Sequence, residues 1–120
     1  MNELLNLDLV EAANGQATIR MPFSKTYLQE ADIVHGGIIS AVADTAAVYA
    51  VLPTVSDPRQ VTGVEFKINF LSPAVAAGGE ITARATLVKR GRRVAVCDTE
   101  VWQGPTFIAK GMFTYLVKEQ

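Results

Sequence analysis

The fold of this chain is decided by residues 37–52, which read GIISAVADTAAVYAVL. The alanine-rich composition favours a helix, and Pro53 directly after the stretch ends it. At about 1.5 Å per residue, this helix would be about 24 Å long. Because nearly all of its faces are apolar, we expect it to be buried at the centre of the molecule.

The segments on either side of this helix have the patterns of β-strands. Residues 7–13 and 16–21 flank Asn14-Gly15, the dipeptide that most readily adopts the positive φ angles of a hairpin turn. Residues 64–70 alternate apolar and polar side chains, which predicts a strand with one covered face and one wetter face. Three further strands, separated by turn sequences, are predicted at residues 81–89, 94–103 and 107–117.

Together these elements predict a single α+β domain over residues 1–120. Hairpin-linked strands form an antiparallel sheet, and a curved sheet wrapped around one long central helix is the most economical way to bury that helix. No internal repeat or linker interrupts the chain. Residues 55–60, between the helix and the next strand, are the expected mobile loop.

Composition and charge exclude several classes of function. Hydrophobic residues make up 49% and charged residues 19% of the chain, which excludes a disordered segment, and the apolar runs fall short of a membrane span. A formal net charge of -1 offers no basic surface for nucleic acid. The amino terminus lacks the pattern of a secretory signal, so the expected location is the cytoplasm. With one cysteine and one histidine, we expect no disulfide, no metal site and no cofactor.

The sharpest local feature is His35-Gly36-Gly37, placed at the start of the predicted helix. The first turn of a helix has amide N–H groups without helical partners, and glycines let a ligand approach them closely. Such a turn can bind the negative charge that develops on a carbonyl oxygen under attack. The alternative is that the two glycines only allow tight packing of the helix.

One acid, Asp44, stands inside the apolar helix. An ionised carboxylate among alanines is costly unless it is solvated or hydrogen-bonded, so we expect Asp44 to face a cavity. There it can act as a general base on water or as a direct nucleophile. The alternative is a structural carboxylate that is bonded to a nearby backbone or hydroxyl group.

The spacing of these candidates constrains the site. Gly37 and Asp44 are seven residues apart, so they share nearly the same helix face but stand about 10.5 Å apart along the axis. One helix therefore cannot apply both residues to a single carbonyl group. If both act on one substrate, a second copy of the chain supplies one of them, which predicts a homodimer with shared sites.

Three further features are weaker candidates: Gln29, His35 and a basic turn. Gln29 can aim a neutral amide at a water or a carbonyl oxygen, although a glutamine in a loop is more often simply solvated. His35 alone is as often a structural hydrogen-bonding group as a functional one, and we do not assign it as the base. A basic turn can grip phosphates, or it can be a solvated turn that protects strand edges; it comprises Lys89, Arg90, Gly91, Arg92 and Arg93.

The remaining aromatic and sulfur side chains fit structural roles. Cys97, in the middle of a strand, is predicted to be a small buried hydrophobic residue. The aromatic residues expected in the core or in an interface are Trp102, Phe107, Phe113 and Tyr115.

The order of these motifs resembles the hotdog-fold thioesterases of the phenylacetate-degradation type. The resemblance is carried by Gln29, by HGGII at residues 35–39, by Asp44, and by VEFKINFLSPA at residues 64–74, and it spans nearly the whole chain. In that family the acid nine positions after the histidine is the base or nucleophile, and the glycine after the histidine donates its N–H to the thioester carbonyl. An Asn or Gln six positions before the histidine helps to position the reactants. Asp44, Gly36 and Gln29 occupy those positions.

The resemblance implies hydrolysis of acyl- or aryl-coenzyme A in a homodimer with shared sites, often paired into a tetramer. It places the coenzyme A phosphates near the basic turn and assigns Gly37, Thr62, Gly63 and Ser72 to substrate binding. Two positions depart from the family. Some members have Ser or Thr where this chain has Gly63, with Thr62 beside it, and Gln29 replaces the Asn of the nearest members.

Two other functions remain open from the sequence. Hotdog folds also serve hydratases and dehydratases of acyl thioesters, since a fold does not fix its function. A non-catalytic module that binds acyl-coenzyme A, with a structural Asp44, is the second alternative.

Overall fold

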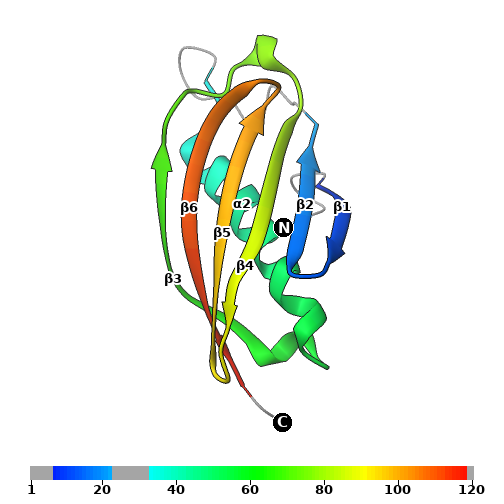
Figure 1. The fold of residues 1–120 in the computed structure, drawn as a ribbon. Helices are drawn as coiled ribbons and strands as arrows, with labels where there is room; N and C mark the ends of the chain where they lie inside the picture. The colour runs from blue at the N-terminus through cyan, green and yellow to red at the C-terminus, as the bar shows by residue number, and fades with distance from the viewer. Residues whose placement is uncertain (1–6, 23–32, 119–120) are drawn as a thin grey trace.

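The computed structural model describes residues 7–22 and 33–118. They form one long helix and a single six-stranded antiparallel sheet with the strand order β1-β2-β4-β5-β6-β3 (Figure 1). The elements are β1 (Asp8–Ala13), β2 (Gln16–Met21), α2 (Gly36–Val51), β3 (Val61–Phe70), β4 (Ile81–Arg90), β5 (Val94–Gln103) and β6 (Thr106–Val117). Short 3-10 turns are η3 (Leu52–Thr54), η4 (Pro58–Gln60) and η5 (Ala76–Gly78).

The predicted elements are confirmed, with small differences at their ends. Helix α2 begins and ends one residue earlier than predicted, because Leu52 and Pro53 belong to the 3-10 turn that follows. Strand β3 begins at Val61, three residues earlier than predicted. The loop at residues 55–60 is ordered by its own hydrogen bonds, since Asp57 and Gln60 form a capping box around η4.

The first hairpin turn has the predicted backbone. Asn14 and Gly15 both have positive φ angles, of 57° and 75°. These angles join β1 to β2 with the twist that two-residue hairpins require.

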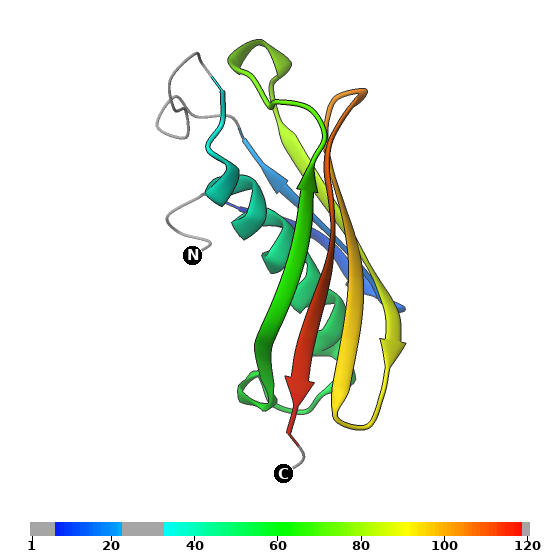
Figure 2. The same cartoon turned by 90° about the vertical axis from the view of Figure 1, so that its left-hand side faces the viewer.

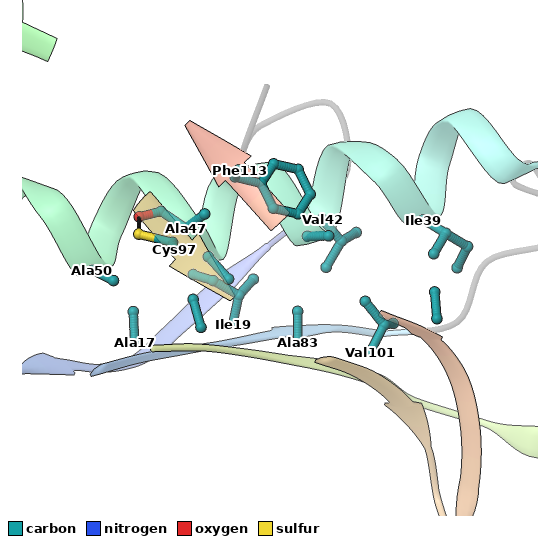
Figure 3. Close-up of a cluster of buried hydrophobic side chains, with 14 of the residues drawn as sticks. Ala17, Ile19, Ile39, Val42, Ala47, Ala50, Ala83, Cys97, Val101 and Phe113 are labelled. Atoms are coloured by element: carbon teal, nitrogen blue, oxygen red, sulfur yellow. Dashed lines mark hydrogen bonds between the residues drawn. The ribbon is translucent and has the colours of Figure 1, made fainter. Parts of the chain in front are cut away.

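Helix α2 crosses the concave face of the sheet and packs an alanine-rich face against it (Figure 1). Small side chains let the helix backbone approach the strands closely, and larger strand residues such as Ile19, Val101 and Phe113 fill the remaining space (Figure 3). Cys97 lies in this core, as predicted, and its thiol donates to the Ala47 carbonyl at 3.5 Å. The buried helix residues are Ile39, Val42, Ala43, Ala46, Ala47, Ala50 and Val51.

The expectation that the helix is buried at the centre of the molecule holds for only one side of the helix in the isolated chain. Helix α2 packs mainly on β2, β4 and β5, and β3 runs along its flank with few contacts (Figure 2). The helix face toward β3 is only half-buried and includes Ser40, Asp44 and Val48. One flank of the helix is therefore open, and it carries the polar residues of the predicted site.

The expectation that every apolar run falls short of a membrane span is wrong for one segment. Helix α2 and η3 together form a 19-residue segment, Gly36–Thr54, with a mean hydropathy of 1.4, which by length and composition alone could cross a membrane. Its apolar character has a different cause here, because it is the core helix of the domain and packs against the sheet.

Candidate active site

The open flank of α2 forms a groove against β3. Its volume is about 630 Å³, and it is bordered on the strand side by Phe66. Phe66 stacks on the buried ring of Phe113, with 5.2 Å between ring centroids, which fixes this wall of the groove. The helix residues along the groove are Gly37, Ser40, Ala41, Asp44, Thr45, Val48, Tyr49 and Leu52. Gly37 and Asp44 therefore share one surface, as their spacing predicts.

Asp44 lies near the middle of α2 and is half-buried. The Tyr115 hydroxyl on β6 contacts its carboxylate Oδ1 at 2.5 Å and its backbone carbonyl oxygen at 3.1 Å. The prediction that Asp44 faces a cavity is confirmed, because it borders both the groove and a second cavity of about 420 Å³. A carboxylate that is both hydrogen-bonded and open to a cavity can accept a proton or attack a carbonyl carbon.

Tyr115 was missed as a site residue by the sequence analysis, which predicted only a core or interface aromatic. It is buried, as predicted, with 2% of its surface exposed. Burial raises the pKa of Tyr115, and its hydrogen bond to Asp44 and the charge of Asp44 raise it further. The phenol is therefore protonated at neutral pH and acts as a donor to Asp44.

The start of α2 is organised by His35. The His35 Nδ1 atom accepts the Gly37 N–H at 2.9 Å, while the His35 carbonyl accepts from Ile38 and Ile39. Among residues 7–22 and 33–118, the Gly36 N–H has no hydrogen-bond partner. His35 thus caps the helix through its ring, and the Gly36 amide is the donor in this turn that remains available to a ligand.

Gly36 and Asp44 open onto different cavities within one chain. Gly36 borders a cavity of about 370 Å³ that also contains Ser72. The Phe70 ring lies against it, since a Cβ built on Gly36 would be 3.3 Å from the ring Cζ atom. The structure therefore brings Gly36 together with Ser72, but separates both from the groove of Asp44.

Gly63 lies beside Asp44, whereas Thr62 does not border the same cavity. Gly63 pairs with Tyr115 across the β3–β6 ladder, and both residues border the second cavity with Asp44. Side chains alternate between the two faces of a strand, so Thr62 is directed to the opposite face. Of these two predicted substrate-binding residues, the structure brings only Gly63 together with Asp44.

The basic turn lies at the end of the molecule opposite the start of α2 (Figures 1 and 2). Arg90 is tied into the protein, because its Nε donates to the Thr54 hydroxyl at 2.8 Å and its Nη1 donates to the Gly91 carbonyl. Lys89 and Arg93 are exposed. Within one chain the basic turn is therefore remote from Gly36. Gln29 lies outside the described residues.

Strand β3 differs from the prediction of one covered face. It forms an edge of the sheet, next to β6. Its apolar side chains remain largely exposed in the single chain: Val64 at 56%, Phe66 at 53% and Phe70 at 54%. A row of exposed apolar side chains on an edge strand is typical of an interface with another chain.

Comparisons with known proteins place the chain in a family. A model of the thioesterase superfamily matches residues 31–106, which is more than half of the chain. The chain therefore belongs to the thioesterase superfamily, and its architecture is the predicted hotdog fold.

Solved structures and a curated relative agree with this assignment. A conserved protein of Pseudomonas aeruginosa, PA5202, is 30% identical with a TM-score of 0.88, over 98% of this chain and 92% of that one. A variant of the phenylacetic acid degradation protein PaaI from Thermus thermophilus is 26% identical with a TM-score of 0.85, over 98% of this chain and 97% of that protein. The 1,4-dihydroxy-2-naphthoyl-CoA hydrolase of Listeria monocytogenes is 24% identical over 86% of this chain and 78% of its own length.

Proposed function

We propose that this chain hydrolyses acyl- or aryl-coenzyme A thioesters to the free acid and coenzyme A. The observation that carries the proposal is Asp44, a half-buried carboxylate in the middle of an apolar helix that opens onto a groove of about 630 Å³. The superfamily supports the reaction class. The coenzyme A thioester hydrolysed by the Listeria relative supports the substrate class.

In the proposed reaction, Asp44 acts on the thioester carbonyl carbon. As a base it takes a proton from a water molecule, whose oxygen attacks the carbon; as a nucleophile its own oxygen attacks, and water later hydrolyses the anhydride. In both routes the Gly36 N–H binds the carbonyl oxygen while negative charge develops on it. The adduct then collapses with cleavage of the carbon–sulfur bond, which gives the free acid in the base route and, before water acts, the anhydride in the nucleophile route. Coenzyme A leaves as a thiolate that takes up a proton from Asp44 or from solvent.

The proposed active form is a homodimer. Two copies of the edge strand β3 can pair antiparallel about a two-fold axis, which would cover the exposed Val64, Phe66 and Phe70. In the proposed dimer, Asp44 of one subunit and Gly36 of the partner subunit act on the same thioester. This arrangement is supported by the separate cavities of these residues within one chain. In the dimer, the exposed Lys89 and Arg93 are the candidates for the coenzyme A phosphates.

The test is the initial rate of thiol release from a panel of aryl-acetyl-, hydroxybenzoyl- and medium-chain acyl-coenzyme A. We expect the native chain to hydrolyse at least one of them, and Asp44→Asn to lose about 100-fold or more of kcat. Addition of water to an enoyl-coenzyme A without thiol release would instead identify a hydratase. Binding of these thioesters without turnover, unchanged in Asp44→Asn, would identify a binding module.

A further inference from the structure

Tyr115 is the one hydrogen-bond donor to the Asp44 carboxylate in the described part of the chain. Its hydroxyl lies 2.5 Å from Oδ1, and among the described residues Oδ2 has no hydrogen-bond partner. The two residues are 71 positions apart in sequence, on β6 and α2. A terminal carboxylate rotates easily, so this single bond determines how the two oxygens are directed.

The surroundings of Tyr115 hold its hydroxyl in place. The ring is buried with 2% exposure, and its strand lies between β5 and β3 in the sheet. The hydroxyl also contacts the Asp44 backbone carbonyl at 3.1 Å, which ties it to the helix itself. The donor is therefore fixed relative to the carboxylate before any substrate arrives.

We propose that Tyr115 is a positioning residue for thioester hydrolysis: it holds Oδ1 of Asp44, so that Oδ2 is directed to the reacting group. The inference rests on the proposed function, because it concerns the orientation of the Asp44 carboxylate in that reaction. In this proposed role, Tyr115 does not touch the substrate and acts only through Asp44. Errors of about 1 Å in the placement of a reacting group can cost about 100-fold in rate.

The test compares Tyr115→Phe with the native chain and with Asp44→Asn, using the thioester that the native chain hydrolyses fastest. Phenylalanine keeps the ring and removes only the hydroxyl. We expect kcat to fall about 10-fold or more, with KM changed less than about two-fold, because substrate contacts are intact. In the Asp44→Asn background, adding Tyr115→Phe should change kcat by less than about two-fold, since the carboxylate through which Tyr115 acts is gone.

Thr99→Val is the matched control. Thr99 is also a fully buried hydroxyl residue of the sheet, on β5, and its Oγ1 has no hydrogen-bond partner among the described residues. Removing this hydroxyl should leave kcat and KM at native values. A loss of activity in both variants would show a general effect of altering the core and would overturn the inference.

The outcomes separate this inference from the proposed function. An inactive Asp44→Asn together with a fully active Tyr115→Phe would overturn the inference alone. Equal losses from Tyr115→Phe in the native and Asp44→Asn backgrounds would also overturn it, because Tyr115 would then act independently of Asp44. A fully active Asp44→Asn, or a native chain without hydrolysis, would overturn the proposed function and this inference with it.

Discussion

Gly63 lies beside one edge of the Tyr115 ring, and a Cβ built on Gly63 would be 3.6 Å from the ring Cε1 atom. This distance is an ordinary van der Waals contact, and Gly63 does not have a positive φ angle. Gly63→Ser should therefore fold with an unchanged or slightly higher Tm, because glycine is unfavourable within a strand. The new hydroxyl would border the cavity of Asp44. Thermal unfolding would measure the Tm, and thiol-release assays would measure the effect of the hydroxyl on activity.

Gly111→Ala is the control for this substitution. Gly111 pairs with Ile68 in the same β3–β6 ladder, but a Cβ there would lie 2.7 Å from the Lys67 backbone oxygen. We expect this variant to lose about 1–3 kcal/mol of unfolding free energy by overpacking. Equal stability of the two variants would contradict the local geometry on which the prediction rests.

The second prediction concerns the Gly36 amide. Gly36 is the first residue of α2, where proline is favoured, and His35 before it has φ -58° and ψ 134°, which suits a residue that precedes proline. Gly36→Pro should therefore keep the helix and remove the N–H. We expect kcat to fall about 100- to 1000-fold, the usual loss when one oxyanion donor is removed.

Gly36→Ala separates the loss of the N–H from the added bulk. Alanine brings its Cβ against the same Phe70 ring, at 3.3 Å, but keeps the amide donor. Phe70 is more than half exposed and can shift. If Gly36→Ala were as inactive as Gly36→Pro, crowding rather than the N–H would explain the loss.

The elements of the fold were predictable because their signals are local. Asn14-Gly15 gives the first turn its positive φ angles, and Pro53 marks the end of α2 to within one or two residues. The pairing of Tyr115 with Asp44 has no local signal, since it depends on how β6 packs against a helix 71 positions away. For the same reason, the alternation in β3 predicts a strand but not that its apolar face lies open at the sheet edge.

The candidate site was predictable only as a set of residue types. An acid in an apolar helix and glycines at the start of that helix indicate a functional site from the sequence alone, and Asp44 does border a cavity. The role of Arg90 was not predictable from the charge of the basic turn. Its guanidinium is held by Thr54 and by the turn itself, a contact that only the folded chain defines.

Gln103 should be important for stability although it is outside the site. It is buried, with 3% exposure; its Oε1 accepts the Val75 N–H, and its Nε2 donates to the Val75 and Gly79 carbonyls. Gln103→Ala leaves these backbone groups unpaired, so we expect a loss of about 2–4 kcal/mol in unfolding free energy. Urea unfolding would measure it, with the exposed Gln16→Ala as a control that should change stability by less than about 0.5 kcal/mol.

The fourth prediction is a loss of stability in alkaline solution. Burial raises the pKa of the Cys97 thiol to about 12. The unfolded chain ionises this thiol near its ordinary pKa of about 8.5, whereas the folded chain does not, so the free energy of unfolding should fall as pH rises from about 9 to about 12. Urea midpoints across this range should fall less steeply for Cys97→Ala. An identical pH dependence in both proteins would contradict the assignment to Cys97.

The most direct test of the shared site is complementation between two inactive variants, Asp44→Asn and Gly36→Pro, co-expressed with different tags. If Gly36 of one subunit and Asp44 of the other form one active site, each mixed dimer contains one site with both native residues. Random pairing then predicts about one quarter of the native rate of thiol release per subunit. If mixed dimers form and can be isolated, but are no more active than the separate variants, the result would contradict a site built from both subunits.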